Sequence, residues 1–215
     1  MRSQALKNLY YATLGKVSLL SLYWHRYCGS AAFNDGYLNL GCGAKYVPGM
    51  INVDGNIFQK KDVWLDVTLG LPIPDNSVKG VYFSHLVEHL SGAKVRRLFS
   101  ECHRVLKQGG ALRIVVPSLE YAIQAYLRDR PSLLPEWPDQ YSSSGGRFNN
   151  FMLCRNQHLM MFDFGLLHEL LSETGFSNVV REHAKRSRYF RTEYMQFESD
   201  PALKDVSLYV EAEKR

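Results

Sequence analysis

Tyr37-Leu38-Asn39-Leu40-Gly41-Cys42-Gly43 and, shortly after it, Met50-Ile51-Asn52-Val53-Asp54 are the stretches that decide the fold. The first is typical of a buried strand that ends in a glycine turn, and the second of a strand that ends on a carboxylate. Glycines let the backbone approach a ligand closely, and a carboxylate accepts hydrogen bonds from ribose hydroxyls. Together the two stretches predict a nucleotide-handling crossover.

Strand and helix patterns alternate through the rest of the chain. Strands are expected over 37–41, 50–54, 63–65, 78–83, 111–116, 176–182 and 206–212, and helices over 95–106, 118–129 and 164–174. The helix over 95–106 has the clearest pattern, because its apolar residues recur at helical spacing, and Gly109-Gly110 is expected to end it. The order predicts an α/β fold with a doubly wound, mostly parallel seven-stranded sheet, in which the strands over 176–182 and 206–212 form a terminal antiparallel pair.

The chain divides into two parts. Residues 1–36 are expected to form an N-terminal helical extension, packed on the domain or acting as a lid, and residues 37–215 form the domain itself. Within the domain, residues 131–160 are rich in proline, serine and glycine, which predicts an irregular insert near the substrate without long regular elements. The stretch from Cys42 to Gly49 is too short for a crossover helix, so a single helical turn or an irregular loop is expected there.

Composition narrows the class of protein. With 215 residues, 46% apolar and 22% charged, the chain suits one compact globular domain. It lacks the run of about 20 apolar residues that spans a bilayer, so we expect no transmembrane segment and at most peripheral membrane contact through the N-terminal helices. Four dispersed cysteines favour a reduced, cytoplasmic setting over a disulfide framework. The sequence leaves the oligomeric state open.

The glycine turn favours one cofactor over another. It lacks the third glycine of the dinucleotide fingerprint, and no full helix follows it to receive a pyrophosphate. A ligand that carries a ribose and an amino acid group, but no phosphate, fits the turn better. The turn therefore favours S-adenosylmethionine over NAD.

The motifs resemble class I S-adenosylmethionine-dependent methyltransferases, most strongly the small type 11 methyltransferases associated with polysaccharide biosynthesis. The resemblance covers residues 37–182 and is carried, besides the two stretches above, by Leu71-Pro72-Ile73-Pro74-Asp75-Asn76-Ser77-Val78, Ser84-His85-Leu86-Val87-Glu88-His89-Leu90, Arg104-Val105-Leu106-Lys107-Gln108-Gly109-Gly110 and Leu112-Arg113-Ile114-Val115-Val116-Pro117. It implies a Rossmann-like methyltransferase fold, S-adenosylmethionine as cofactor, and transfer of a methyl group to a small-molecule or glycan-type acceptor.

By position, the resemblance implies cofactor-binding residues at four strand ends. Gly41, Cys42 and Gly43 would hold the methionine part, Asp54 the ribose hydroxyls and Asp66 with Val67 the adenine edge, while Ser84 and His85 would border the methyl donor, and Asn39 stands where many relatives carry an acid. Lys45 replaces the usual final glycine of the turn. These two departures affect the surroundings of the methionine ammonium.

Residues 85–89 contain the candidate catalytic residues His85, Glu88 and His89. Imidazole suits the removal of a proton from a hydroxyl acceptor, because its pKa lies near the working pH; His85 is the first candidate and His158 a second. The same stretch matches the His-x-x-Glu-His signature of zinc peptidases. We expect no metal, because no downstream motif supplies a third ligand. Packing at the start of the next helix is the competing role for Glu88 and His89.

Rival functions stay open at this point. Residues 181–191 form a basic cluster interleaved with Tyr189 and Phe190, which would serve an RNA methyltransferase, although the modest net charge of +5 leads us to expect no nucleic-acid partner. A non-catalytic S-adenosylmethionine-binding protein and a zinc hydrolase are two further rivals.

Overall fold

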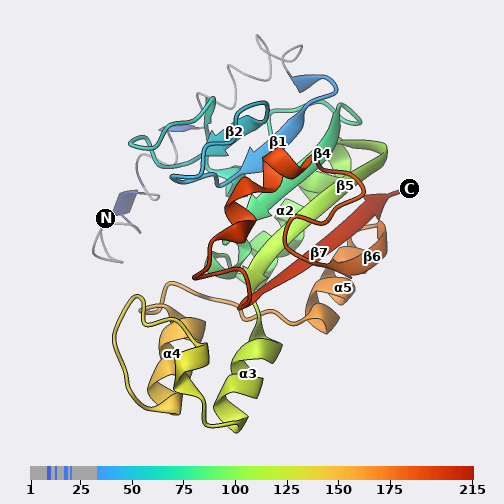
Figure 1. Cartoon of the computed structure of the whole chain (residues 1–215). Coiled ribbons are helices and arrows are strands. Elements are labelled where there is room, and N and C mark those ends of the chain that lie inside the picture. Colours follow the sequence, from blue (N-terminus) through green and yellow to red (C-terminus); the bar gives the residue numbers. More distant parts are fainter. Residues whose placement is uncertain (1–8, 11–12, 14–16, 19, 21–32) are drawn as a thin grey trace.

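The computed structural model describes residues 9–10, 13, 17–18, 20 and 33–215 (Figure 1). The expected N-terminal extension over 1–36 therefore lies mostly outside the described residues. The strands are β1 (Tyr37–Leu40), β2 (Ile51–Asp54), β3 (Val63–Trp64), β4 (Val78–Ser84), β5 (Leu106–Pro117), β6 (Phe176–Glu182) and β7 (Ser207–Lys214). The helices are α2 (Gly92–Val105), α3 (Leu119–Leu127), α4 (Ser144–Leu153) and α5 (Phe164–Glu173), with short 3-10 helices η2 (Val67–Leu69), η3 (Val87–His89), η4 (Pro131–Leu133) and η5 (Thr192–Ser199).

In the described part of the chain, seven strands form one sheet in the order β3-β2-β1-β4-β5-β7-β6. Strands β1 to β5 pair in parallel, and β7 runs antiparallel to both β5 and β6. The predicted mostly parallel, doubly wound sheet is confirmed, and so is the antiparallel end. From β1 the chain moves outward to β2 and β3, then returns to β4 on the other side of β1. The strand order thus reverses between β1 and β4, where α/β folds bind ligands.

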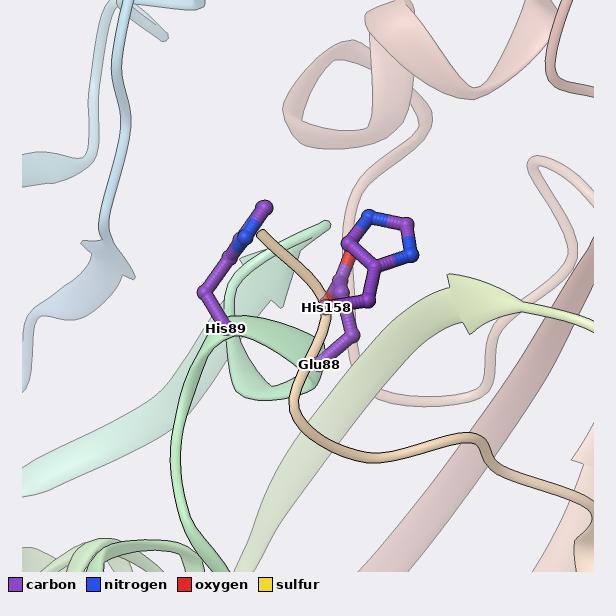
Figure 2. Close-up of side chains that lie close together, drawn as sticks. All are labelled: Glu88, His89 and His158. Carbon is purple, nitrogen blue, oxygen red and sulfur yellow. The ribbon is translucent and has the colours of Figure 1, made fainter. Parts of the chain in front are cut away.

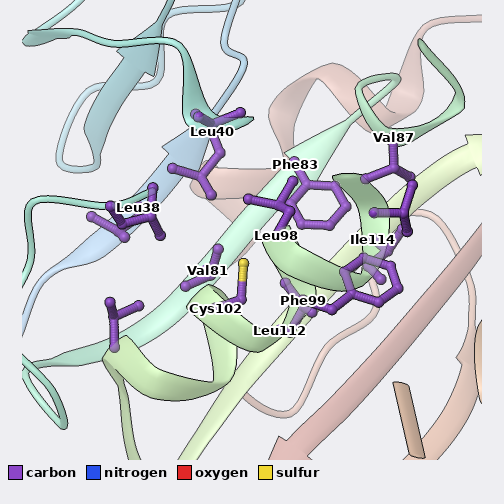
Figure 3. Packing of buried hydrophobic residues seen from close by; sticks show 14 of the residues in the cluster. Leu38, Leu40, Val81, Phe83, Val87, Leu98, Phe99, Cys102, Leu112 and Ile114 are labelled. Carbon is purple, nitrogen blue, oxygen red and sulfur yellow. The ribbon is translucent and has the colours of Figure 1, made fainter. Parts of the chain in front are cut away.

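The main core lies between the sheet and α2 (Figure 3). Leu38, Val81 and Phe83 from β1 and β4 are fully buried there, and α2 contributes Leu98 and Phe99. The rings of Phe83 and Phe99 stack with centroids 6.3 Å apart. The apolar stripe predicted for this helix is therefore the face that holds it on the sheet.

The glycine pair after α2 does not end the helix, contrary to prediction. Helix α2 ends at Val105, and β5 begins at Leu106, which pairs with Val78 of β4. Gly109 has φ +74° and lies where the register between β4 and β5 shifts. The pair therefore forms an irregularity inside a long strand, because Leu106 gains a partner in the sheet that the helical pattern alone does not reveal.

The insert over 131–160 contains the ten-residue helix α4, so the expectation of no long regular element is wrong. The Ser143 side chain caps this helix by accepting a hydrogen bond from the Gly146 N–H at 3.1 Å. Arg147 donates to the Leu134 carbonyl at 3.0 Å and ties the helix to the preceding loop. The serine run that suggested a loop supplies the N-cap instead. Figure 1 shows α4 beside α3, apart from the sheet.

A buried charge network fixes the C-terminal segments on the sheet. Arg113 of β5 is fully buried, and its guanidinium donates twice to the Glu198 carboxylate of η5, each at 2.7 Å. It also donates to Glu211 of β7 at 2.8 Å and to the carbonyls of His183 and Arg186, each at 2.9 Å. Because these bonds end on different segments, one side chain joins β5, β7, η5 and the loop after β6.

Among the described residues, no helix is both long and apolar enough to cross a membrane.

Removing one side of this network should destabilise the fold strongly. Glu198→Ala leaves the buried Arg113 charge without its bidentate partner, and we expect a loss of about 3–5 kcal/mol in the free energy of unfolding. Glu193→Ala is the control, since Glu193 lies on the same 3-10 helix and forms an exposed 3.9 Å ion pair with Arg191; its cost should stay within about 0.5 kcal/mol. Urea unfolding of both variants checks this. Equal midpoints would contradict a structural role for the network.

Candidate active site

The glycine turn after β1 has the backbone conformation that glycine permits. Gly41 and Gly43 have φ values of +62° and +51°. A Cβ on Gly41 would lie 2.7 Å from the Cδ1 atom of Leu86, whereas a Cβ on Gly43 would meet nothing within 4 Å. Gly41 therefore allows close packing against the segment after β4, and Gly43 borders open space at the tip of the turn. The loop between β1 and β2 contains no helix, so of the two predicted alternatives, a single helical turn or an irregular loop, the structure has the irregular loop.

Asp54 joins the end of β2 to this turn. Its carboxylate accepts a hydrogen bond from the Gly43 N–H at 2.7 Å and another from the Asn56 N–H at 2.6 Å. The residue is 7% exposed. The structure thus brings together the two sequence features, glycine turn and strand-end acid, that were predicted to bind one ligand.

Asn39 and Cys42 hold the glycine turn in place through hydrogen bonds. The Asn39 amide donates to the Lys45 carbonyl and to Asn52 Oδ1, each at 3.0 Å, so its N–H groups hold the loop closed. The Cys42 N–H donates to the Val53 carbonyl at 3.1 Å, and its thiol is buried. Burial, reinforced by the nearby Asp54 charge, raises the pKa of Cys42 to about 12. The thiol therefore stays protonated and inert at neutral pH.

Asp66 and Val67 follow β3 as predicted. The Asp66 carboxylate caps η2 by accepting from the Thr68 N–H at 2.9 Å, and Val67 is buried. The Asp66 N–H donates to Ser18 Oγ at 3.3 Å. A residue of the N-terminal extension thus reaches the end of β3.

A second described residue of the extension, Tyr10, contacts the end of β2. Its hydroxyl donates to the Gly55 carbonyl at 2.7 Å and accepts from the Ile57 N–H at 3.0 Å. Tyr10 is buried. Tyr10 and Ser18 therefore lie beside the strand ends that carry Asp54 and Asp66.

His85 follows Ser84, the last residue of β4, in a strained conformation. Its φ is +55°, in the left-handed region that a histidine rarely adopts, and its N–H donates to the Val115 carbonyl at 2.8 Å. The ring's Nδ1 lies 3.2 Å from Glu88 Oε1, and Nε2 lies 3.3 Å from Ser207 Oγ. Such backbone strain concentrates at functional sites. Ser207 starts β7, and no local sequence signal pointed to it.

Glu88, His89 and His158 lie together (Figure 2), and Glu88 contacts His85. One carboxylate oxygen and one nitrogen of each imidazole lie within 4.8 Å of one another, and the two ring centroids are 5.0 Å apart. Burial acts to raise the pKa of Glu88, but the contact with His85 and the charges of His85 and His89 lower it overall. Burial lowers the pKa of His158. A carboxylate and a neutral imidazole are therefore the favoured forms.

Residues 85–89 differ in two respects from the patterns that they suggested. Only Val87–His89 are helical, as the 3-10 helix η3, and His85 precedes it, so His85 and His89 do not face one site from successive turns of an α-helix. Ser91, not Glu88 or His89, occupies the N-cap position of α2. Glu88 and His89 therefore do not cap the start of α2.

Some residues of the basic cluster over 181–191 make contacts within the domain. Phe190 is buried, and Arg181 pairs with Glu120 while its guanidinium lies 4.9 Å from the Phe164 ring centroid. A nucleic-acid surface of this kind needs free rings for base stacking. Phe190 does not supply one.

Comparisons with known proteins agree with this geometry. Residues 28–114 match a family described as a methyltransferase domain. An S-adenosylmethionine-dependent methyltransferase from Archaeoglobus fulgidus is similar with a TM-score of 0.52 and 18% identity, over 97% of this chain and 99% of that one. An S-adenosylmethionine-dependent methyltransferase from Thermotoga maritima, described as a possible histamine N-methyltransferase, gives 0.53 and 13%, over 100% and 97%.

Phosphoethanolamine N-methyltransferase 2 from Haemonchus contortus, in complex with S-adenosylmethionine, gives a TM-score of 0.51 and 13% identity, over 93% of this chain and 52% of that one. No curated protein matched the chain. At these identities the structural likeness establishes the fold, which is the Rossmann-like methyltransferase fold expected from the sequence.

The turn should not tolerate a side chain at Gly41. Gly41→Ala adds a methyl group 2.7 Å from Leu86 and forces alanine into the left-handed region, so we expect a loss of about 1–3 kcal/mol in unfolding free energy and weaker cofactor binding. Gly145→Ala in α4 is the matched control, because its Cβ would meet nothing within 4 Å. That variant should be neutral or slightly more stable. Thermal unfolding of both checks the difference, and a Gly41→Ala protein as stable as the control would refute it.

Proposed function

We propose that this S-adenosylmethionine-dependent methyltransferase transfers the methyl group to a hydroxyl of a small-molecule or glycan-type acceptor. The observation that carries the proposal is the meeting of two strand ends at the switch point. Gly41 and Gly43 follow β1, His85 follows β4, and Leu86 packs against Gly41. A cofactor held on the first strand end would present its methyl group to the second.

The chain's own residues suit this cofactor. Gly43 borders open space, and Asp54 lies beside it with an acceptor group suited to ribose hydroxyls. We assign the methionine part to Gly41, Cys42 and Gly43, acting through their backbone, and the adenine edge to Asp66 and Val67. S-adenosylmethionine supplies a methyl group already activated on a sulfonium. Asn39 would act through the shape of the turn rather than by direct contact.

His85 is the proposed proton acceptor. As the acceptor oxygen takes the methyl group, its proton would pass to Nε2 of His85, the nitrogen that lies 3.3 Å from Ser207 Oγ when no acceptor is bound. Nδ1 faces the Glu88 carboxylate at 3.2 Å and keeps its own proton, so Glu88 would stabilise the imidazolium that forms. Holding donor and acceptor in line supplies most of the remaining acceleration. Glu88 therefore acts through His85 in this scheme.

The acceptor would bind between the strand ends and the segments around them. The insert over 131–160 exposes the aromatic residues Trp137 and Tyr141, whose rings offer an apolar face with a polar edge. Such surfaces suit sugar-like acceptors. We therefore propose that the enzyme takes part in polysaccharide biosynthesis in the cytoplasm. An RNA methyltransferase is less well supported, because Phe190 is buried and Arg181 is paired. A protein that binds the cofactor without turnover is the second rival.

Two measurements test the proposal together. Isothermal titration of the purified protein with S-adenosylmethionine and with S-adenosylhomocysteine should give micromolar dissociation constants for both. Release of S-adenosylhomocysteine should then be followed with a panel of sugars, phenols, amines and a short RNA. Turnover with hydroxyl acceptors supports the proposal. Cofactor binding without turnover on any of them would favour the non-catalytic rival, and turnover on the RNA alone would favour the RNA methyltransferase.

Asp54 should be needed for cofactor binding. Asp54→Ala removes the ribose acceptor and the bond to the Gly43 N–H, so we expect affinity for S-adenosylhomocysteine to fall at least tenfold. Glu169→Ala is the control, because Glu169 is also acidic but lies exposed on α5, which packs against β6 and β7 at the other end of the sheet. Isothermal titration of both variants measures the effect. Unchanged affinity in Asp54→Ala would reject the ribose assignment.

His85 should matter for turnover more than for cofactor affinity. His85→Asn is the informative substitution, because asparagine tolerates the left-handed backbone at this position but cannot accept the proton. We expect kcat on a hydroxyl acceptor to fall by roughly 10²–10⁴ with little change in the dissociation constant of S-adenosylhomocysteine. Near-normal kcat would exclude His85 as the base.

A further inference from the structure

Glu88, His89 and His158 come from two segments that are far apart in sequence but joined by backbone hydrogen bonds. Glu88 and His89 belong to η3, and His158 follows α4. The N–H groups of Leu159 and Met160 both donate to the Glu88 carbonyl, at 2.7 and 3.2 Å. These bonds hold His158 against η3, so the three side chains form a cluster that the fold itself fixes (Figure 2).

The two imidazoles are held in the same way. Nδ1 of His89 lies 3.0 Å from the Gln157 carbonyl, and Nδ1 of His158 lies 2.9 Å from the Met152 carbonyl. A carbonyl can only accept, so each Nδ1 carries a proton, and in the neutral imidazole Nε2 is then the nitrogen with a lone pair for a metal. Histidines that bind metals are oriented by such bonds to carbonyl groups.

The Glu88 carboxylate lacks the partners that a buried charge requires. Glu88 is 1% exposed, and neither of its oxygens accepts a well-aligned hydrogen bond from the described residues. Oε1 lies 3.2 Å from His85 Nδ1, and the charges of His85 and His89 act on the carboxylate, but Oε2 has no hydrogen-bond partner among the described residues. A buried carboxylate oxygen without a hydrogen-bond partner is costly, and a bound cation would remove that cost.

We propose that Glu88, His89 and His158 bind a divalent cation of the borderline class, such as Zn²⁺, Co²⁺ or Fe²⁺. Two imidazoles with one carboxylate are typical ligands for these ions, and three protein ligands leave positions open for a further oxygen. The donor atoms lie within 4.8 Å of one another. Ligands around a tetrahedral zinc ion are roughly 3.3 Å apart, so binding needs side-chain movements on the order of 1 Å.

The proposed site departs from the expectation that no metal binds. The His-x-x-Glu-His stretch lacked a third ligand in the sequence, and its two histidines do not act as a pair. One histidine of the stretch and the distant His158 take their place, and His85 is left free for the proton. The cluster is thus unlike the peptidase arrangement, although it uses the same stretch.

The site suggests how the acceptor is chosen, an extension that rests on the proposed function. A hydroxyl oxygen bound at an open position of the cation would have a lowered pKa, and the cation would fix that oxygen close to His85. An acceptor with two neighbouring hydroxyls, one on the cation and one at His85, would fit both groups. The substrate class would then be a vicinal diol, as in sugars and catechols.

Cobalt binding tests the site directly. The full-length protein is treated with chelator, dialysed and titrated with CoCl₂, and visible absorption and calorimetry are followed. We expect one Co²⁺ per chain, with d–d absorption typical of nitrogen and oxygen ligands. Glu88→Gln and His158→Asn each remove a proposed ligand, so each should weaken binding by more than the roughly 10- to 100-fold that loss of an outer-shell partner costs. His168→Ala is the matched control, because His168 is exposed on α5, and it should bind as the parent does.

The outcomes separate the cation site from the proposed function. Circular dichroism of each variant checks folding, and a folded Glu88→Gln protein that binds Co²⁺ like the parent would overturn the site. Absence of stoichiometric binding by the parent would do the same. S-adenosylhomocysteine affinity is measured on the same samples. Cobalt binding without cofactor binding would leave the site intact and reject the methyltransferase assignment, whereas methyl transfer unchanged by chelator would reject the cation's role in acceptor binding.

Discussion

The parallel pairing of β1 with β4 is the constraint on which the site depends. Leu38 of β1 pairs with Ile51 of β2 on one side and with Val81 of β4 on the other, so β1 is hydrogen-bonded along both edges. The carboxyl ends of β1 and β4 must then lie side by side. The glycine turn and the His85 segment therefore meet, and the missing side chain of Gly41 lets Leu86 approach closely. The short loops alone could not bring the glycine turn and the His85 segment together; the pairing of β1 with β4 does so.

Two buried charges illustrate how structure and function divide in this protein. Arg113 is fully buried, but its guanidinium reaches two carboxylates and two carbonyls, so its charge is satisfied and its role is to join segments. Glu88 is equally buried, yet its carboxylate lacks comparable partners among the described residues. Since native proteins rarely leave a buried polar group unpaired, the incomplete set at Glu88 points to a ligand. Glu211 of the Arg113 network also has an unpaired carboxylate oxygen, so the two imidazoles beside Glu88 are what distinguish it as a candidate ligand.

The parts of the fold that have a local pattern could be predicted from the sequence. The apolar stripe of α2, the alternation of strands and helices along the chain and the final strand pair belong to this class, because burial imposes periodicity on the residues themselves. The start of β5 does not, since Leu106 continues the helical stripe and only its pairing with Val78 makes it a strand residue. At the site, the turn and Asp54 were predictable from one stretch. Ser207 and the closeness of His158 to Glu88 were not, because tertiary contacts alone create them.

A crystal structure of the protein with S-adenosylhomocysteine would test the central claim most directly, namely that the cofactor lies across the switch point between β1 and β4. We expect the ribose hydroxyls on the Asp54 carboxylate, the amino acid part against the turn from Gly41 to Gly43, and the thioether sulfur facing Ser84 and His85. A ribose bound away from Asp54, or a sulfur directed away from the end of β4, would contradict it.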